Sequence, residues 1–510
     1  MIDMKEVTRL LIQDVREDPT YLCIFTLVFL MGILAYRRLY RKVYNLPPGP
    51  PTRFHHGNLK DFNKDPKIYL TLAEMANEYG SIYRVYTGPR LVVVLNSYEM
   101  VKEALIKKQI DFSGRPRNLS NEIQSDHYHG VIFAPYSERW KAHRKMLNQA
   151  LRNFASGDLL VQNIHASMSI ASHYLHPDLG KTYDPFQFVT LIIYNFICAM
   201  CVGKTFDPND EEYKMLCFRR RSITDIIGNG FDADFFPYKR FLESKRINKA
   251  KDVINQLLNY AKSIIDDHRK GFSPGVIKDF TDHILASQRE NFKKDSPEES
   301  KLHDRHLINT IMDIFSAGTE TTVNTVYWVL LYVASYPEVQ AKMHQQIDQN
   351  VGKNTLIDLK EKKKLPFIDA TVFEVMRHRP AVPLGIPRST ICDTKIGKYD
   401  IPKDTDVIVN IWKLHHDPAE WDDPDVFKPE RFLEEDGSLR AKPQAFLPFG
   451  VGRRICVGES VAKPEICLVT ALLLQKYKFS LPPNRELSFK PADLAFTSYS
   501  KSYELVIEKR

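Results

Sequence analysis

One long helical segment limits the fold of this chain more than any other feature. Residues Asp304–Ser335 keep a helical pattern without interruption until Pro337, which cannot continue a helix. At ~1.5 Å per residue, about 32 residues make a helix of about 48 Å, long enough to cross a whole domain. A helix of that length has to lie at the centre of a large body. The sequence therefore predicts a mainly helical fold arranged around this segment.

The rest of the body combines more helices with small sheets. The chain has 510 residues, of which 43% are hydrophobic and 26% charged, as in an ordinary packed protein. Alternating runs at Ile82–Tyr86 and Leu91–Leu95 flank a short turn, and residues 395–411 also have the pattern of hairpin strands. Residues 288–304 are charged and predict an exposed loop. We expect a mainly α fold with small β-sheets and no second domain boundary in the body.

The N-terminal end predicts a membrane anchor. Pro19–Tyr36 is uncharged and mainly apolar, and as a helix it would span about 27 Å, close to a thin bilayer of the endoplasmic reticulum. The basic run Arg37–Lys42 follows directly without a cleavage site, which favours a single span over a signal peptide and a cytosolic body. A stiff proline-rich hinge comes next. The expected domains are 1–45, anchor and linker, and 46–510, the catalytic body.

Charge and cysteine usage exclude several classes of protein. The net charge of +8 is spread over the chain, which favours a local basic face over nucleic-acid binding. Seven scattered cysteines do not form a disulfide framework of a secreted domain, so a reducing compartment is expected. Cys198 and Cys201 have the spacing of a redox motif, but they stand in an apolar run and are predicted to be buried.

A glycine-rich segment near the C-terminus presents one cysteine. In Phe449–Gly458, three glycines bracket Cys456, and glycine lets the backbone approach a large flat group closely. Amide donors and Arg454 would stabilise a thiolate, and a thiolate ligand gives haem iron the electron density that favours O–O cleavage. A buried cysteine in a plain turn is one alternative. A dinucleotide loop is a poorer one, because the third glycine and a preceding parallel strand are missing.

Polar residues interrupt the middle of the long helix. Ala317 and Gly318 have small side chains that would leave room for a bound ligand, while Glu320 and Thr321 offer a carboxylate and a hydroxyl for proton delivery. The structural alternative is that the hydroxyls bond to carbonyls of the preceding turn and bend the helix.

The segment 449–458 matches the pattern F-x-x-G-x-R-x-C-x-G, and with it the chain resembles the cytochrome P-450 superfamily. The resemblance covers essentially the whole chain. Its other elements follow in the family's order: 47–50, Trp140-x-x-x-Arg144, 317–322, Glu374-x-x-Arg377 and 429–432. It implies the cytochrome P-450 fold, a triangular helix-rich body with a long central helix over haem b, and Cys456 as the axial ligand of the iron.

The resemblance also implies roles for individual residues. It makes Glu320 and Thr321 a proton relay, with Ala317 and Gly318 beside it. It places Glu374, Arg377 and Arg431 in a buried structural cluster that supports the haem loop. The positions expected to contact haem, mainly its propionates, are Trp140, Arg144, Arg388, Phe449 and Arg454. Relatives usually have histidine where Arg388 stands, which makes that contact the least typical of the set.

The activity implied by the resemblance is insertion of one oxygen atom from O2 into a lipophilic substrate. The chain has no nucleotide loop of its own, so electrons are expected from an NADPH-dependent flavin reductase, with cytochrome b5 as a second partner. Basic residues on the tryptophan helix, together with Lys362, Lys363, Lys364 and Arg453, form the expected docking face. Membrane lipid is a further expected partner, and nucleic acid is not.

Two groups within the superfamily resemble the chain most. They are the animal microsomal steroid 17α-hydroxylase/17,20-lyase group and the aryl-hydrocarbon-oxidising group, so steroid hydroxylation and oxidation of polycyclic or other xenobiotic compounds both stay open. Residues 223–238, where steroid contacts would fall, do not align cleanly. A haem-thiolate isomerase or dehydratase would not need Glu320 and Thr321. A non-catalytic haem sensor would not need Arg377, the long helix and a reductase face together.

Paired histidines could suggest a second metal site. No acidic or cysteine partners complete such a site in the sequence, so all of these histidines are expected in loops or on the surface. They are His55, His56, His127, His129, His303, His306, His415 and His416.

Overall fold

The computed structural model describes residues 20, 23–24, 26–29, 31–32, 44–62, 67–154, 157–228, 230–273, 275–293, 298–483, 488–492 and 497–510. Contacts divide the chain into two units, Met1–Leu46 and Pro47–Arg510. Half of the predicted anchor, Pro19–Tyr36, lies outside the described residues. Among the residues that are described, no helix has the length and apolar character needed to cross a membrane.

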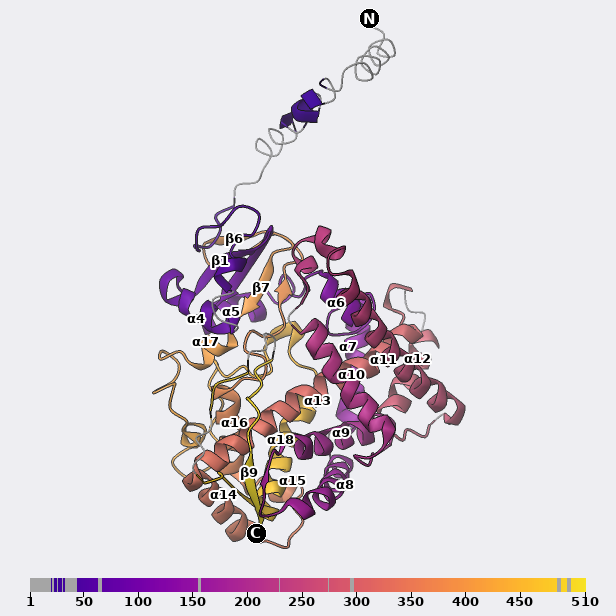
Figure 1. Cartoon of the computed structure of the whole chain (residues 1–510), viewed down its shortest axis with the longest axis vertical. Coiled ribbons are helices and arrows are strands. Elements are labelled where there is room, and N and C mark those ends of the chain that lie inside the picture. The colour runs from indigo at the N-terminus through magenta and orange to yellow at the C-terminus, as the bar shows by residue number, and fades with distance from the viewer. Residues whose placement is uncertain are drawn as a thin grey trace, which may run out of the picture. The chain divides into compact units, whose positions relative to one another are not determined.

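The predicted long helix is confirmed. Helix α13 spans Asp304–Ser335, and one residue, Tyr336, separates it from Pro337, where α14 begins. It runs through the middle of the larger unit (Figure 1). The helices packed against it include α9 (Phe186–Val202), α11 (Ser244–Gly271), α16 (Pro366–His378) and α18 (Glu459–Lys476).

Shorter helices complete the body. The remaining α-helices are α3 (Leu59–Phe62), α4 (Ile68–Tyr79), α5 (Tyr98–Lys102), α6 (Leu119–Gln124), α7 (Glu138–Phe154), α8 (Asp158–Leu175), α10 (Glu211–Ile227), α12 (Phe280–Lys293), α14 (Pro337–Asn350), α15 (Leu359–Lys362) and α17 (Ile411–His415). There is one short π-helical turn among the described residues, η1 (Glu103–Lys107). The described 3₁₀ turns are η2 (His176–Asp178), η3 (Asp232–Asp234), η4 (Pro237–Arg240), η5 (Glu298–Ser300), η6 (Pro429–Phe432) and η7 (Gly452–Arg454).

The loop predicted over 288–304 begins later than expected. Helix α12 continues to Lys293. Gln288 is buried in it, and its side-chain amide donates to the carbonyl of Leu302 at 2.9 Å. A polar side chain with a main-chain partner is stable in the interior. The charged character of residues 288–304, from which the loop was predicted, does not reveal such a partner.

Three small sheets accompany the helices. The first has the order β1 (Ile82–Thr87), β2 (Arg90–Leu95), β7 (Asp406–Val409), β4 (Arg388–Ser389), with β1 antiparallel and β7 parallel to β2. The second has the order β3 (Thr182–Tyr183), β9 (Leu505–Lys509), β8 (Tyr477–Ser480). Strands β5 (Thr394–Ile396) and β6 (Tyr399–Ile401) form an antiparallel pair.

The predicted hairpin over 395–411 is therefore only partly correct. Its first half is the β5–β6 hairpin, but β7 leaves the hairpin and inserts between β2 and β4. Val407 on β7 is buried, so this strand gains both a core contact and two hydrogen-bonding neighbours in the larger sheet.

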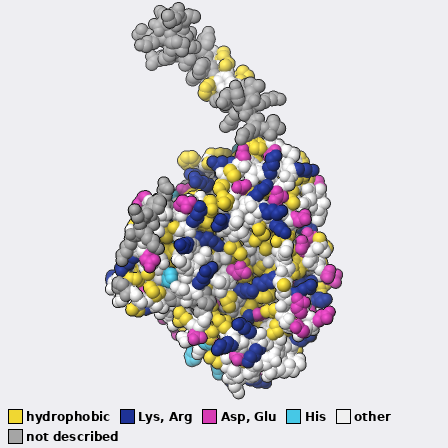
Figure 2. Space-filling view, turned by 180° about the vertical axis from the view of Figure 1, so that it is seen from behind, with side chains coloured by type: hydrophobic (Ala, Val, Ile, Leu, Met, Phe, Trp, Pro, Cys, Tyr) yellow, Lys and Arg dark blue, Asp and Glu magenta, His cyan; other side chains and the backbone are white. Residues whose placement is uncertain are grey.

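The burial of two cysteines confirms the sequence analysis, while the charge on the face shown in Figure 2 is mixed. Cys198 and Cys201 are fully buried in α9, as predicted. Lys and Arg side chains lie over much of the face shown in Figure 2, with Asp and Glu side chains among them. The positive charge on that face is thus interspersed with negative charge.

Candidate active site

The loop that carries Cys456 folds back on itself. The Cys456 amide donates to the carbonyl of Phe449 at 2.9 Å. Gly450 and Gly452 adopt φ values of 71° and 77°, which disfavour any other residue. A Cβ on Gly452 would overlap the carbonyl oxygen of Leu105, so glycine is also needed for the close approach to η1. The glycines of the motif thus shape a tight turn around the cysteine.

The Cys456 side chain combines two properties. The residue is accessible, yet burial among the surrounding protein raises the pKa of its thiol. Hydrogen bonds from the amides of Gly458 and Glu459, at the start of α18, act in the opposite direction and lower the pKa, as does the charge of Arg144. A metal cation at the sulfur would complete the stabilisation of a thiolate.

Four arginines gather next to this loop. They are Arg115, Arg144, Arg388 and Arg454. Burial lowers the pKa of each, and repulsion from other members of the group lowers it further for Arg115, Arg388 and Arg454; the pKa of Arg388 falls to about 10. None forms an ion pair with a carboxylate of the described residues. Uncompensated buried charge is costly, so this cluster is built to receive an anionic group.

Main-chain carbonyls hold the arginines in place. Arg454 donates to Ser113 at 2.9 Å and to Ala134 at 2.7 Å, while Arg388 donates to Val451 at 2.9 Å. These bonds fix the direction of each guanidinium without neutralising its charge. Arg144 donates to the carbonyl of Ile455 in the same way.

Trp140 supports the cluster in an indirect way. Its indole N–H donates to the carbonyl of Val131 at 3.0 Å, and the Arg454 guanidinium lies 4.0 Å from its ring centroid. Arg115 is the member that the sequence analysis did not single out. It follows Gly114, and no local charge pattern distinguishes it from a surface arginine.

The middle of α13 presents different residues on different faces. Ala317 is accessible in the middle of α13, although several helices pack against this helix. The Thr321 hydroxyl donates to the carbonyl of Ala317 at 2.7 Å, which is the bond expected for the helix-bending alternative. A Cβ on Gly318 would lie 3.1 Å from Ile197 of α9, so this glycine serves close helix packing. Glu320 accepts from the Thr497 hydroxyl at 3.4 Å.

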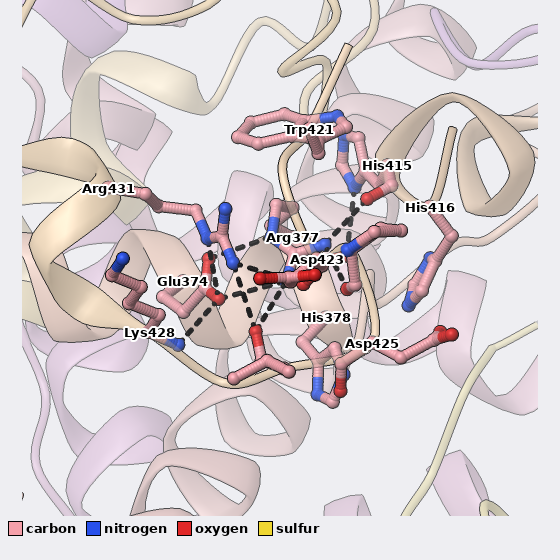
Figure 3. A network of polar contacts seen from close by, with 12 residues as sticks. Glu374, Arg377, His378, His415, His416, Trp421, Asp423, Asp425, Lys428 and Arg431 are labelled. Carbon is pink, nitrogen blue, oxygen red and sulfur yellow. Dashed lines mark hydrogen bonds and ion pairs between the residues drawn. The ribbon is translucent and has the colours of Figure 1, made fainter. Parts of the chain in front are cut away.

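A buried ionic network links α16 to η6 and the segment before it (Figure 3). Arg377 donates to both carboxylate oxygens of Glu374, at 2.7 and 2.9 Å, and Arg431 donates to the same carboxylate at 3.0 Å. Arg377 also donates to the carbonyls of His415 and Pro424, at 2.7 and 2.8 Å. Because every charge has a partner, removing one would leave another buried and unpaired, which costs about 3–5 kcal/mol.

Two of the histidines expected at the surface are buried. His306 lies in α13, and His415 at the end of α17 is fully enclosed. Both have hydrogen-bond partners inside the protein, so the expectation of loop or surface positions is wrong for them. The sequence contains no pattern that marks these partners, because several of them are main-chain atoms.

These features fit one kind of prosthetic group. The accessible Cys456 sulfur can bind a metal at the centre of such a group, and the arginines, which have no carboxylate partner among the described residues, can bind acidic groups at its edge. Haem b is flat, holds iron and carries two carboxylates, so the residues present fit it.

Comparison with known proteins agrees with this geometry. Residues 47–507 match the family model for Cytochrome P450. The chain belongs to the cytochrome P450 family. It is 33% identical over 459 residues to Cytochrome P450 1A1 of Oryzias latipes, covering 87% of each chain. It is also 33% identical over 435 residues to Steroid 17-alpha-hydroxylase/17,20 lyase of Gallus gallus, covering 84% of this chain and 85% of that relative.

A solved structure extends the similarity to three dimensions. A zebra fish cytochrome P450 with progesterone has a TM-score of 0.78 and 28% identity, and the match covers 87% of this chain and 99% of that one. The predicted resemblance and the helix-rich P450 fold are thus confirmed. This P450 is a monooxygenase that uses haem b with an axial cysteine thiolate. Its microsomal relatives receive electrons from reductases and act on lipophilic substrates.

Proposed function

We propose that Cys456 is the axial ligand and that the four arginines bind the haem propionates. The support is the accessible Cys456 sulfur beside a cationic cluster that has no described carboxylate partner. Trp140 would act through Arg454, against which it packs, and Phe449 through its carbonyl, which holds the Cys456 amide. When bound, haem supplies the chemistry of oxygen activation.

Proton delivery would then belong to α13. Thr321 lies one helical turn after the accessible Ala317, and its hydroxyl oxygen keeps lone pairs while its proton is held by the Ala317 carbonyl. Glu320 is the neighbouring acid, and the Thr497 hydroxyl bonds to its carboxylate. The Thr321 oxygen would accept a hydrogen bond from a proton donor and so keep that donor in place. Glu320 would then replace the proton that the donor gives up.

For the substrate we propose a rigid, multi-ring lipophile of the steroid type. The observation that carries this proposal is the fit of the chain, over 87% of its length, to a P450 solved with progesterone. Apolar ring surface leaving water contributes about 25 cal/mol per Å², and a rigid ligand loses little conformational entropy on binding. Hydroxylation at carbon 17 is the narrower form of the proposal, because a steroid 17-alpha-hydroxylase/17,20 lyase is among the relatives.

A second candidate is oxidation of planar polycyclic compounds. Cytochrome P450 1A1 of Oryzias latipes is as similar in sequence as the steroid enzyme, at 33% identity. The two candidates share a flat, apolar substrate and differ in the need for polar contacts at the ends of the molecule.

Binding spectra would separate these candidates. The purified ferric holoprotein is titrated with progesterone, with a planar polycyclic aromatic, and with a flexible fatty acid of similar size. A high-spin shift with progesterone at the lowest concentration supports the steroid proposal, and a preference for the aromatic supports the second candidate. A shift with the fatty acid alone would contradict both while leaving the monooxygenase activity intact.

We also propose a membrane location in the endoplasmic reticulum, with a single N-terminal span and a cytosolic body. The body itself exposes large apolar side chains: Phe54, Phe241 and Leu242 are 99%, 87% and 82% exposed. Tyr238 joins them and accepts or donates a 2.8 Å hydrogen bond with His55. These four residues form an apolar group that suits the lipid interface.

A fractionation experiment tests the membrane proposal. Deletion of residues 1–36 should leave a haem-containing body that still binds vesicles in part, and the further change Phe241→Ser with Leu242→Ser should release it. Glycosylation of Asn118 in cells would contradict a cytosolic body, because Asn118-Leu-Ser120 is an acceptor sequence.

We propose that a basic face that includes Arg453 of the Cys456 loop binds the reductase. Lys145, Lys363 and Arg453 are all exposed. Lys362 is less suited, because it is paired with Asp369 in the interior. Reductase affinity that falls steeply with salt, and less steeply in a Lys145→Ala, Arg453→Ala variant, would support this face. Cytochrome b5 is proposed as a competitor for it.

A further inference from the structure

His415 uses both nitrogens of its buried ring. Its Nδ1 lies 3.1 Å from the carbonyl oxygen of Arg377, and the amide of Leu447 donates to its Nε2 at 3.0 Å. The amide proton can only go to Nε2, so Nε2 is the acceptor and Nδ1 carries the hydrogen. Burial, followed by the charges of His416 and Arg377, lowers the pKa of His415 well below its ordinary value. The ring is therefore neutral and its tautomer is fixed.

Three further contacts fix the direction of the ring. The Arg377 guanidinium donates to the carbonyl of His415 at 2.7 Å, so each of these residues binds the backbone of the other with its side chain (Figure 3). The ring stacks on Phe446, with centroids 5.6 Å apart and an angle of 25°. The ring of Trp421 lies edge-on to it at 6.4 Å. His415 is thus a rigid part of the network that contains Glu374.

The bond from Leu447 reaches the cysteine loop in two short steps. The carbonyl of Leu447 accepts from the amide of Gly450 at 3.0 Å, which closes a turn over residues 447–450. Phe449 in this turn provides the carbonyl that accepts the Cys456 amide at 2.9 Å. His415 holds the turn at its first amide, and the turn holds Cys456.

We propose that His415 is a positioning residue that transmits the rigidity of the Glu374–Arg377 network to the turn 447–450 and so fixes the Cys456 sulfur for metal binding. The proposal rests on Cys456 as the axial ligand. Without the acceptor at Nε2, the Leu447 amide would be buried and unpaired, which favours opening of the turn.

Two substitutions test the hydrogen bonds of the two ring nitrogens separately. The Oε1 of glutamine reaches the position of Nε2, so His415→Gln can keep the bond to the Leu447 amide. The amide of asparagine reaches the position of Nδ1, so His415→Asn can keep only the bond to Arg377. His416→Gln is the matched control, since this neighbouring histidine stacks on Trp412 and its Nε2 has no hydrogen-bond partner among the described residues.

The experiment uses the full-length holoprotein and two readouts. Hydrogen exchange should be at least about tenfold faster at the Leu447 and Cys456 amides in His415→Asn, and close to wild type in His415→Gln and His416→Gln. In the reduced carbon monoxide complex, His415→Asn should lose the red-shifted Soret band of thiolate ligation faster than the other two variants under mild denaturation.

Specific outcomes would overturn the proposal. Equal behaviour of the asparagine and glutamine variants, in exchange and in the spectrum, would reduce His415 to a packing residue. Unchanged exchange at Leu447 in both would show that the turn does not depend on the ring. If wild-type protein gave no thiolate band while Leu447 exchange still rose in His415→Asn, the axial-ligand assignment would fail and the hold on the turn would stand.

Discussion

The cysteine side of the molecule, which consists of the loop 449–458 and the Glu374–Arg377 network, is held together in a different way from the segment 223–243. On the cysteine side, the ion pair of Arg377 with Glu374 is fully buried, and Arg377 also donates to the carbonyl of Pro424, 47 positions along the chain. In the other region the charged pair is partly exposed: Arg246 lies 3.2 Å from Glu243, and it donates to the nearby carbonyls of Ile226 and Gly230 at 2.6 and 2.7 Å. The Ser120 hydroxyl, from a distant segment, donates to Asp234 at 2.5 Å.

The spacing of the partners explains why the sequence revealed one region and not the other. Glu374 and Arg377 stand three positions apart on one helix, so a short pattern suffices to find the pair. Ser120 and Asp234 are 114 positions apart, and no short pattern links them. The predictions below test each kind of anchor, beginning with the largest expected effect.

Glu374→Gln should destabilise the cysteine side most. Two arginines would lose their buried anionic partner, at a cost of about 3–5 kcal/mol in unfolding free energy, and haem should be retained poorly. Chemical unfolding followed by far-UV circular dichroism and haem absorbance measures both effects. The control is Glu430→Gln, which removes a half-exposed partner of Lys342 and should cost under about 1 kcal/mol. Equal losses in the two variants would contradict the role of the network.

Thr321→Ala should impair proton delivery without harming the fold. Product formation should fall by about 10²-fold, the scale of a general acid–base group, while NADPH consumption continues and peroxide is released. The control is Thr319→Ala, because Thr319 makes the same kind of bond, to the carbonyl of Phe315, from a buried position. Unchanged coupling of NADPH to product in Thr321→Ala would remove this residue from the relay.

Sequence reasoning reached the scaffold more easily than the details of the site. The bounds of α13 and the β1–β2 hairpin follow from periodicity and from proline and turn signals, which are local. Arg115 and His415 were missed or misplaced because their partners are carbonyls and amides brought near by the fold. The role of Gly318 in packing against Ile197 was also hidden, since that contact joins two helices more than a hundred residues apart.

Asp313→Asn should change how stability depends on pH. Burial raises the pKa of Asp313 to about 7, although the amides of Ile132 and Val131 donate to its carboxylate. The folded chain thus keeps a proton that the unfolded chain releases near pH 4, so this contribution is full below about pH 4 and is lost as pH rises through about 7. Urea unfolding at pH 5 and pH 8 should show a smaller fall in stability for Asp313→Asn. Identical falls in both proteins would contradict the shift.

Ser120→Ala should produce the smallest effect, confined to the region without motifs. It removes one bond to Asp234 and should cost about 1 kcal/mol, with a changed KM for lipophilic substrates and unchanged haem binding. Ser222→Ala, at a partly exposed serine of α10, is the control. Loss of haem in Ser120→Ala would show that the two regions are coupled more tightly than their contacts indicate.

The most direct test of the central claim is the absorption spectrum of the reduced protein with carbon monoxide. Wild-type protein should show the red-shifted Soret band of a thiolate ligand, and Cys456→Ser should lack it, whether or not haem is retained. Cys467→Ser, at a buried cysteine of α18, should leave the band in place. Persistence of the band in Cys456→Ser would contradict the account.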